Sequence, residues 1–187
     1  MRLRLRLLWL MLRSLWCTRL RVLDEAVVPF TVLPNDVDVS RQTDDRYLAI
    51  ADLGRLDLAL RNGLGPTLLR LRWAPLAMVA AVRFRHPLRL FQRYRLRTRI
   101  LWWDDRAFYI RQVFERGGRT QATAYVCATF LGPHGAIPPA TVLARIGQAV
   151  EPPRMPGQVS HLRAFTDTVH REQIEEDGVG TPQSQVR

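Results

Sequence analysis

The stretch Arg46–Leu64, RYLAIADLGRLDLALRNGL, decides the architecture of this 187-residue chain. Apolar residues recur in it every three or four positions, which predicts a helix with one apolar side. These residues are Ala49, Leu53, Leu56, Leu60 and Leu64. Asp44 or Asp45 is a natural N-cap, and Gly63 marks the end of the helix. The rest of the chain must therefore pack around one long helix placed early in the sequence.

The sequence on both sides of this helix predicts β-structure. Residues 20–33 form a strand rich in Val and Phe before the helix. After it, apolar and basic residues alternate in Val82–Arg85 and more regularly in Arg93–Leu101, as is typical of strands with one exposed face. Two further strands are expected at 107–116 and 119–131.

The connections between the later strands indicate an antiparallel meander. Gly117-Gly118 is a hairpin signal between the last two strands, and a short helix is expected at about 140–146. The order is therefore one strand, one long helix and then four strands. This order predicts an α+β fold in which a curled antiparallel β-sheet wraps around one central helix.

This single domain spans residues 20–149 and is preceded by an Arg- and Leu-rich segment, residues 1–19. Within Met1–Trp16 the arginines fall mostly on one side of a helix, so the segment is imperfectly amphipathic. It either docks on the domain or on a second subunit, which is slightly favoured, or makes a peripheral contact with a membrane.

Residues 150–187 form the third part of the chain and contain few apolar residues. Such a composition has little surface to bury, so the segment is expected to be a largely disordered tail. A weak helix around 163–176 is the most that this composition supports.

All 28 basic residues are Arg, and the net charge is +11. Either a general replacement of Lys by Arg or an anionic partner explains this excess, because guanidinium groups match phosphate geometry. Coenzyme A and an anionic membrane are candidate partners. Nucleic acid is unlikely, because no nucleic-acid-binding module is recognised.

Cysteine and histidine say little about chemistry. Cys17 and Cys127 form no CxxC pair, and the four histidines are scattered, so neither a metal nor another cofactor is expected. The absence of a secretory signal favours a cytoplasmic protein, which is membrane-associated if the first segment contacts lipid.

Several short motifs occur in an order that is informative. Pro34–Asp38 reads P-x-D-x-D, Arg46–Leu48 starts the long helix with R-Y-L, and Asp52–Arg55 continues it. With the Arg93–Arg99 strand, these motifs resemble the acyl-CoA thioesterases of the hotdog superfamily, such as 4-hydroxybenzoyl-CoA thioesterase. The resemblance covers about residues 20–147 and implies a hotdog fold with hydrolysis of an acyl-CoA thioester.

The resemblance implies that Asp38 is the catalytic carboxylate, which attacks the thioester carbonyl or activates a water. Backbone N–H groups at the start of the helix would stabilise the oxyanion. The residues implied to surround the substrate are Asp36, Gln42, Asp44, Asp45, Arg46 and Tyr47. The residues alone leave open that Asp36 and Asp38 only cap the loop, and Asp36 is the better candidate for that role.

The loop also departs from the family pattern. Ser40-Arg41-Gln42 replaces Asn-x-His, Asp44-Asp45 replaces Asn-Asn, and one residue is missing before Arg46. A glutamine cannot act as an acid or base, and an ionised aspartate cannot donate a hydrogen bond. Two hypotheses therefore remain: a weak acyl-CoA thioesterase, and a catalytically silent hotdog protein that binds an acyl thioester or a protein partner.

The strand at 119–131 is long and is expected to form an edge of the sheet. An exposed edge of that length invites pairing with a second chain. A homodimer or homotetramer is therefore expected.

Overall fold

The computed structural model describes residues 2–38 and 41–179. The strands are β1 (Ala26–Thr31), β2 (Val37–Asp38), β3 (Arg41–Gln42), β4 (Ala74–Phe84), β5 (Arg93–Trp103), β6 (Phe108–Arg116), β7 (Arg119–Gly132) and β8 (Gly135–Ile137). The helices are α1 (Arg2–Trp16), α2 (Asp44–Arg61), α3 (Gly65–Leu71), α4 (Pro139–Arg145) and α5 (Gly157–Val179), and Pro34–Asp36 form a 3-10 turn.

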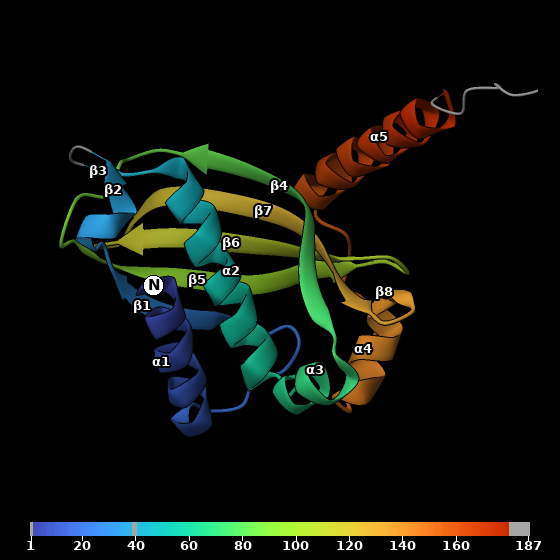
Figure 1. The fold of residues 1–187 in the computed structure, drawn as a ribbon, viewed down its shortest axis with the longest axis horizontal. Coiled ribbons are helices and arrows are strands. Elements are labelled where there is room, and N and C mark those ends of the chain that lie inside the picture. Colours follow the sequence, from blue (N-terminus) through green and yellow to red (C-terminus); the bar gives the residue numbers. More distant parts are fainter. Residues whose placement is uncertain (1, 39–40, 180–187) are drawn as a thin grey trace, which may run out of the picture.

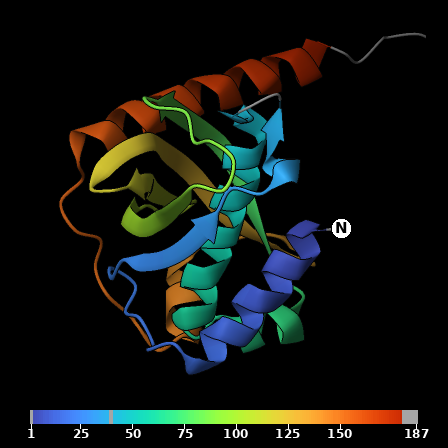
Figure 2. The same ribbon diagram turned by 90° about the vertical axis from the view of Figure 1, so that its left-hand side faces the viewer.

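Six strands build one antiparallel sheet in the order β1-β5-β6-β7-β4, with β8 paired to β7, and β2 pairs separately with β3. Figure 1 shows α2 lying across this sheet, and Figure 2 shows the strands curving around it. The predicted α+β fold, a curled antiparallel sheet around one central helix, is confirmed. The hairpin at Gly117-Gly118 is also confirmed, because both glycines have positive φ angles, 57° and 73°.

α2 rests on the sheet through an apolar face and one glycine. Tyr47, Ile50 and Leu58 are buried against the strands. At Gly54 the helix comes closest to the sheet, where a Cβ atom would lie 2.5 Å from the Leu96 side chain. Gly54 therefore sets the distance between helix and sheet, although a glycine inside a helix lowers its intrinsic stability.

The start of α2 differs from the prediction. The N-cap is Thr43, and both Asp44 and Asp45 lie inside the first turn. Carboxylates in the first turn interact favourably with the positive end of the helix dipole, so the aspartates still favour a helix start here.

The predicted edge strand is wrong. β7, which contains residues 119–131, lies between β6 and β4 and is paired on both sides. The sheet ends at β1 on one side and at β4 on the other, so β4 takes the edge position predicted for β7. The residues of β4 are nearly all exposed, including Leu76, Met78 and Phe84. The sequence could not distinguish these two strands, because both contain many small apolar residues.

α1 packs on α2 and β1, so the favoured docking on the domain is confirmed (Figure 2). Leu10 of α1 is fully buried in this contact. Among residues 2–38 and 41–179, no helix combines the length and the apolar content that crossing a membrane requires.

The predicted disordered tail is wrong for Gly157–Val179, which form α5. Its first turns are held by Val159 and Leu162, which pack on Tyr109 and Cys127 of the outer sheet surface. The remainder of α5 is mostly exposed and projects beyond the sheet (Figure 1). The start of this helix is thus held on the sheet by two buried apolar side chains. The average composition of residues 150–187 does not reveal such a small contact. The last residues of the predicted tail, 180–187, lie outside the described part.

Candidate active site

Asp36 anchors the loop between β1 and α2. Its carboxylate accepts two hydrogen bonds from the Arg6 guanidinium of α1, at 3.0 and 2.6 Å, and one from the N–H of Leu33 at 2.9 Å. Its carbonyl accepts a hydrogen bond of 3.1 Å from the N–H of Thr43, just before α2. The side chain is completely buried. Asp36 therefore holds the shape of the loop and is not placed to contact a substrate.

Asp38, the predicted catalytic residue, ends β2. The structure places its backbone opposite Arg41 of β3, the strand that leads through Thr43 into α2. The side chain of Asp38 lies outside the part of the chain that the structure describes, as does Ser40. What is established is that Asp38 belongs to the loop that Arg6 and Asp36 clamp beside the start of α2.

Gln42 and Tyr47 turn into the domain. The Tyr47 hydroxyl accepts a hydrogen bond of 3.2 Å from the N–H of Leu88, and burial raises the pKa of Tyr47. The Gln42 amide is buried, as is the hydroxyl of Tyr94, and neither has a hydrogen-bond partner within the described residues. Gln42 and Tyr47, which were predicted to contact the substrate, are therefore interior residues that support the loop from inside the domain.

The first turn of α2 is the exposed part of the predicted site. Asp44 and Asp45 are both exposed, and the Arg46 guanidinium lies 3.4 Å from the Asp45 carboxylate. The hydroxyl of Thr43 donates to Asp45, and this bond, with the nearby charge of Arg46, lowers the pKa of Asp45. Asp45 is therefore ionised at neutral pH, in the turn whose N–H groups would otherwise receive an oxyanion.

A cavity of about 450 Å³ lies beneath the second half of α2, between the helix and the strands β4, β6 and β7. Its wall is mostly apolar and includes Leu56, Ala59, Ala77, Ile110, Phe130 and Leu143. Thr129 also lines it, and its buried hydroxyl has no partner among the described residues. A volume of this order is typical of small-molecule sites.

A polar bridge crosses from the cavity into the sheet. Arg55, which lines the cavity, pairs with Asp52 and donates to the Gln112 side-chain oxygen at 2.6 Å. Gln112 in turn donates to the carbonyl of Ala51 at 2.8 Å and to the Thr98 hydroxyl at 3.1 Å. Burial lowers the pKa of Arg55, and the nearby charge of Asp52 acts in the opposite direction, since it favours the charged guanidinium. The bridge fixes one positive and one negative charge at the side of an apolar cavity.

The sequence did not identify this cavity or its polar bridge. In the sequence, Asp52 and Arg55 stand out only as part of a family-like helix. No motif includes Gln112 or Thr129. One signal was present: Gln112 is a polar residue between Ile110 and Phe114 on the otherwise apolar, inward-facing side of β6. A fully buried amide must be hydrogen-bonded, so such a residue marks a polar network.

The curled sheet around α2, the clamped D-x-D loop at the start of that helix and the apolar cavity beneath it together define a hotdog protein of the thioesterase type. The model of the thioesterase-like superfamily matches residues 32–161. The chain belongs to this superfamily.

Two vertebrate proteins named THEM6 are similar to this chain. The protein from Xenopus laevis is 31% identical over 152 residues, which cover 79% of this chain and 72% of that protein. The protein from Danio rerio is 36% identical over 112 residues, which cover 59% of this chain and 55% of that protein. The matched regions therefore leave part of each relative uncovered.

Solved structures show the same fold at low sequence identity. A gentisyl-coenzyme A thioesterase is 20% identical, with a TM-score of 0.59 over 65% of this chain and 99% of its own. A 1,4-dihydroxy-2-naphthoyl-CoA thioesterase from Synechocystis is 12% identical, with a TM-score of 0.58 over 66% and 95%. A Staphylococcus aureus protein in complex with CoA is 13% identical, with a TM-score of 0.58 over 76% and 96%.

Proposed function

We propose that this protein hydrolyses an acyl-CoA thioester whose acyl group occupies the cavity beneath α2. The observation that carries this proposal is the position of the cavity along the helix that starts beside Asp38. At roughly 1.5 Å per residue, Asp45 in the first turn and Asp52 at the cavity are about 10 Å apart along the helix axis. An extended acyl chain bridges such a distance and keeps its carbonyl at the helix start.

In this arrangement Asp38 attacks the thioester carbonyl or activates a water for the attack. The backbone N–H groups of the first turn of α2 stabilise the oxyanion, because the first N–H groups of a helix have no partner inside the helix. Collapse of the tetrahedral intermediate breaks the C–S bond, and the coenzyme A thiolate leaves and takes a proton. Where water is the nucleophile, this step gives the free carboxylic acid directly. Where Asp38 is the nucleophile, the acyl group stays on Asp38 as an anhydride, which water then hydrolyses to the carboxylic acid and free Asp38. The ionised Asp45 opposes charge development there, so the proposed activity is weak.

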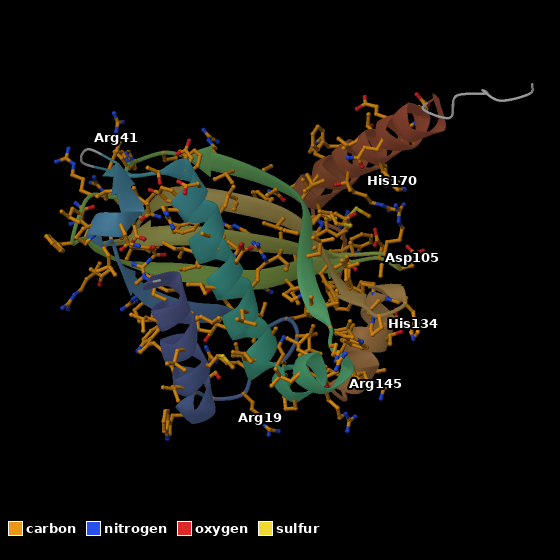
Figure 3. All side chains as sticks on the ribbon, in the orientation of Figure 1. Arg19, Arg41, Asp105, His134, Arg145 and His170 are labelled. Carbon is orange, nitrogen blue, oxygen red and sulfur yellow. The ribbon has the colours of Figure 1, made fainter. Side chains whose placement is uncertain are left out.

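Basic residues near the start of α2 suit the phosphates of coenzyme A. Arg41 is exposed and lies at the same end of the molecule as the start of α2 (Figure 3). Arg89, bridged to Arg41 across the two backbones, is exposed as well. The Staphylococcus aureus structure with CoA supports a coenzyme A partner for this fold.

The second candidate function is a catalytically silent protein that binds an acyl thioester or a protein partner. The exposed carboxylates of Asp44 and Asp45 favour it, because they place negative charge where an oxyanion would form. The apolar cavity is compatible with both candidates, so binding alone does not separate them.

We also propose that the functional unit is a homodimer formed through β4. This strand exposes a free edge and the side chains of Leu76 and Met78. Unpaired edges with apolar side chains tend to recruit another strand, and a two-fold axis would pair β4 with its copy. A monomeric mass by light scattering at micromolar concentration would contradict this proposal.

A panel of acyl-CoA substrates of increasing chain length, assayed with a thiol reagent, tests the activity. The expected result is slow turnover that rises with chain length until the cavity is full. If no substrate is hydrolysed while calorimetry shows acyl-CoA binding, the silent candidate replaces the enzyme. If neither turnover nor binding is observed, the acyl-CoA proposal is wrong.

A further inference from the structure

Two arginines of α1 whose side chains the structure describes, Arg6 and Arg13, lie on the side that faces the protein. Arg6 donates to the Asp36 carboxylate and, at 2.8 Å, to the carbonyl of Thr31. Arg13 donates to the buried carboxylate of Asp57 at 3.2 Å and to the carbonyl of Val27 at 3.1 Å. An amphipathic helix on a soluble domain normally shows the opposite orientation, with charges outward.

These two buried ion pairs fix the rotation of α1. Asp36 and Asp57 have fully buried side chains. Turning α1 by half a turn would leave Asp36 without its arginine and Asp57 with only Arg61, which lies 3.6 Å away. Breaking a buried pair in this way is strongly unfavourable. The outward face of α1 is therefore a permanent feature of the fold.

The side chains that the structure describes on that outward face are apolar. Leu5, Leu8, Trp9, Leu12 and Trp16 follow one another at helical spacing and are all exposed, and we call them the outward stripe. Its two most exposed members are Trp16, at 80%, and Leu5, at 64%. A contiguous apolar patch of this kind on a soluble protein marks an interaction surface.

The charge around the outward stripe is positive. The sequence contains no acidic residue in 1–23 and none in 58–103, the range that includes α3. Arg19, just after α1, and Arg145 of α4 lie at the same end of the molecule (Figure 3), and both are exposed. Leu69 and Arg70 of α3 are exposed as well. The exposed side chains that the structure describes on α1 and α3, together with Arg19, are thus apolar or cationic, and residues 1–23 and 58–103 contain no acidic residue.

We propose that the outward stripe docks α1 in the plane of an anionic lipid bilayer. A helix of 15 residues is about 22 Å long, too short to span the hydrocarbon core, but suited to lying along its surface. Tryptophan favours the boundary between headgroups and acyl chains, and arginine is attracted to anionic headgroups. The surface is independent of thioester hydrolysis, and the docked protein presents its acyl cavity near a lipid phase.

Flotation of the full-length protein with vesicles tests this proposal. We expect binding to phosphatidylcholine vesicles that contain phosphatidylglycerol and much weaker binding to phosphatidylcholine alone. The double variant Leu8→Gln/Leu12→Gln removes two members of the outward stripe without touching the buried pairs, and should lower the partition coefficient by about tenfold or more.

The matched control is Leu131→Gln/Phe165→Gln, which changes two exposed apolar residues, one on β7 and one on α5, and should leave binding unchanged. Brominated lipids should quench tryptophan emission in the parent and less in Trp16→Phe. Both changes in α1 should leave the melting temperature close to that of the parent.

Three outcomes would overturn the proposal. The first is no binding to anionic vesicles. The second is equal binding by the parent and the Leu8→Gln/Leu12→Gln variant, which would show that charge alone is responsible. The third is a change in oligomeric state of that variant in the absence of lipid, which would show that the outward stripe contacts a second copy of the chain.

Discussion

The two halves of α2 present different kinds of chemistry. The N-terminal half begins beside a polar loop, in which Arg6 pairs with Asp36, and its first turn carries the exposed Asp44 and Asp45. The C-terminal half covers an apolar cavity whose character comes from many side chains together. The first region depends on the identity of single residues, and the second depends on shape. Substitutions in the two regions should therefore fail in different ways.

α1 connects these two regions. Arg6 reaches Asp36 in the loop before α2, whereas Arg13 reaches Asp57 in the second half of α2. Burial raises the pKa of Asp57, and the nearby charges of Arg13 and Arg61 act against this. The same helix thus clamps the polar loop and the part of α2 above the cavity.

The largest expected effect is that of Asp38→Asn on turnover. Asparagine keeps the shape of the side chain but loses its nucleophilicity and basicity, so kcat should fall by about 100-fold or more. Steady-state assays on the best acyl-CoA substrate measure this, with circular dichroism to verify the fold. An equally active variant would show that the catalytic role of Asp38 is wrong.

The next effect separates the two anchors of α1. Arg6→Met and Arg13→Met should each lower the free energy of unfolding by about 2 kcal/mol, below the usual cost of breaking a buried pair because both arginines are partly exposed. Arg6→Met should also lower kcat, because Asp36 shapes the loop that carries Asp38. Arg13→Met should leave kcat unchanged. Equal losses of kcat would mean that α1 acts only through overall stability.

A smaller effect is expected from reshaping the cavity. Ala59→Phe fills part of it and should shift the preference, measured as kcat/KM, toward shorter acyl chains by about tenfold. Leu143→Ala enlarges the cavity and should shift the preference toward longer chains, at a cost of about 2–4 kcal/mol in stability. Identical chain-length profiles for both variants would show that the acyl group binds elsewhere.

The smallest effect is expected at the exposed start of α2. Asp44→Asn/Asp45→Asn removes two negative charges beside the proposed thioester site and should lower KM for acyl-CoA by about threefold at low salt. Adding Gln42→His restores the histidine of the family pattern, from which Ser40 and the missing residue still depart, and should also raise kcat. Asp105→Asn is the matched control, because Asp105 is exposed at the opposite end of the molecule (Figure 3). A similar change in KM for the control would indicate a nonspecific effect of net charge.

Much of the fold was predictable from local patterns. The apolar period of Arg46–Leu64 predicted α2, and alternation in Arg93–Leu101 predicted β5. The D-x-D and R-Y-L motifs led to the correct superfamily. The predictions that failed concern relations between elements: which strand forms the edge, and whether α5 finds a surface on which to pack.

The candidate site was predictable only where residues are close in sequence. The loop from Asp36 to Tyr47 was identified, but the sequence did not show that Asp36, Gln42 and Tyr47 turn inward. Asp36 is held by Arg6, and Gln42 and Tyr47 both hydrogen-bond to the backbone of Leu88; Arg6 and Leu88 come from distant parts of the chain. No spacing rule within the loop contains that information.

The sequence by itself determined the periods of the helices and strands, because these depend on neighbours three or four residues apart, or two. It also determined the large excess of arginine. Only the tertiary structure decided that Arg6 and Arg13 of α1 face inward, because their partners Asp36 and Asp57 are 30 and 44 residues away. It also decided that an apolar cavity lies beneath α2, since a cavity is formed by side chains from several elements and belongs to none of them.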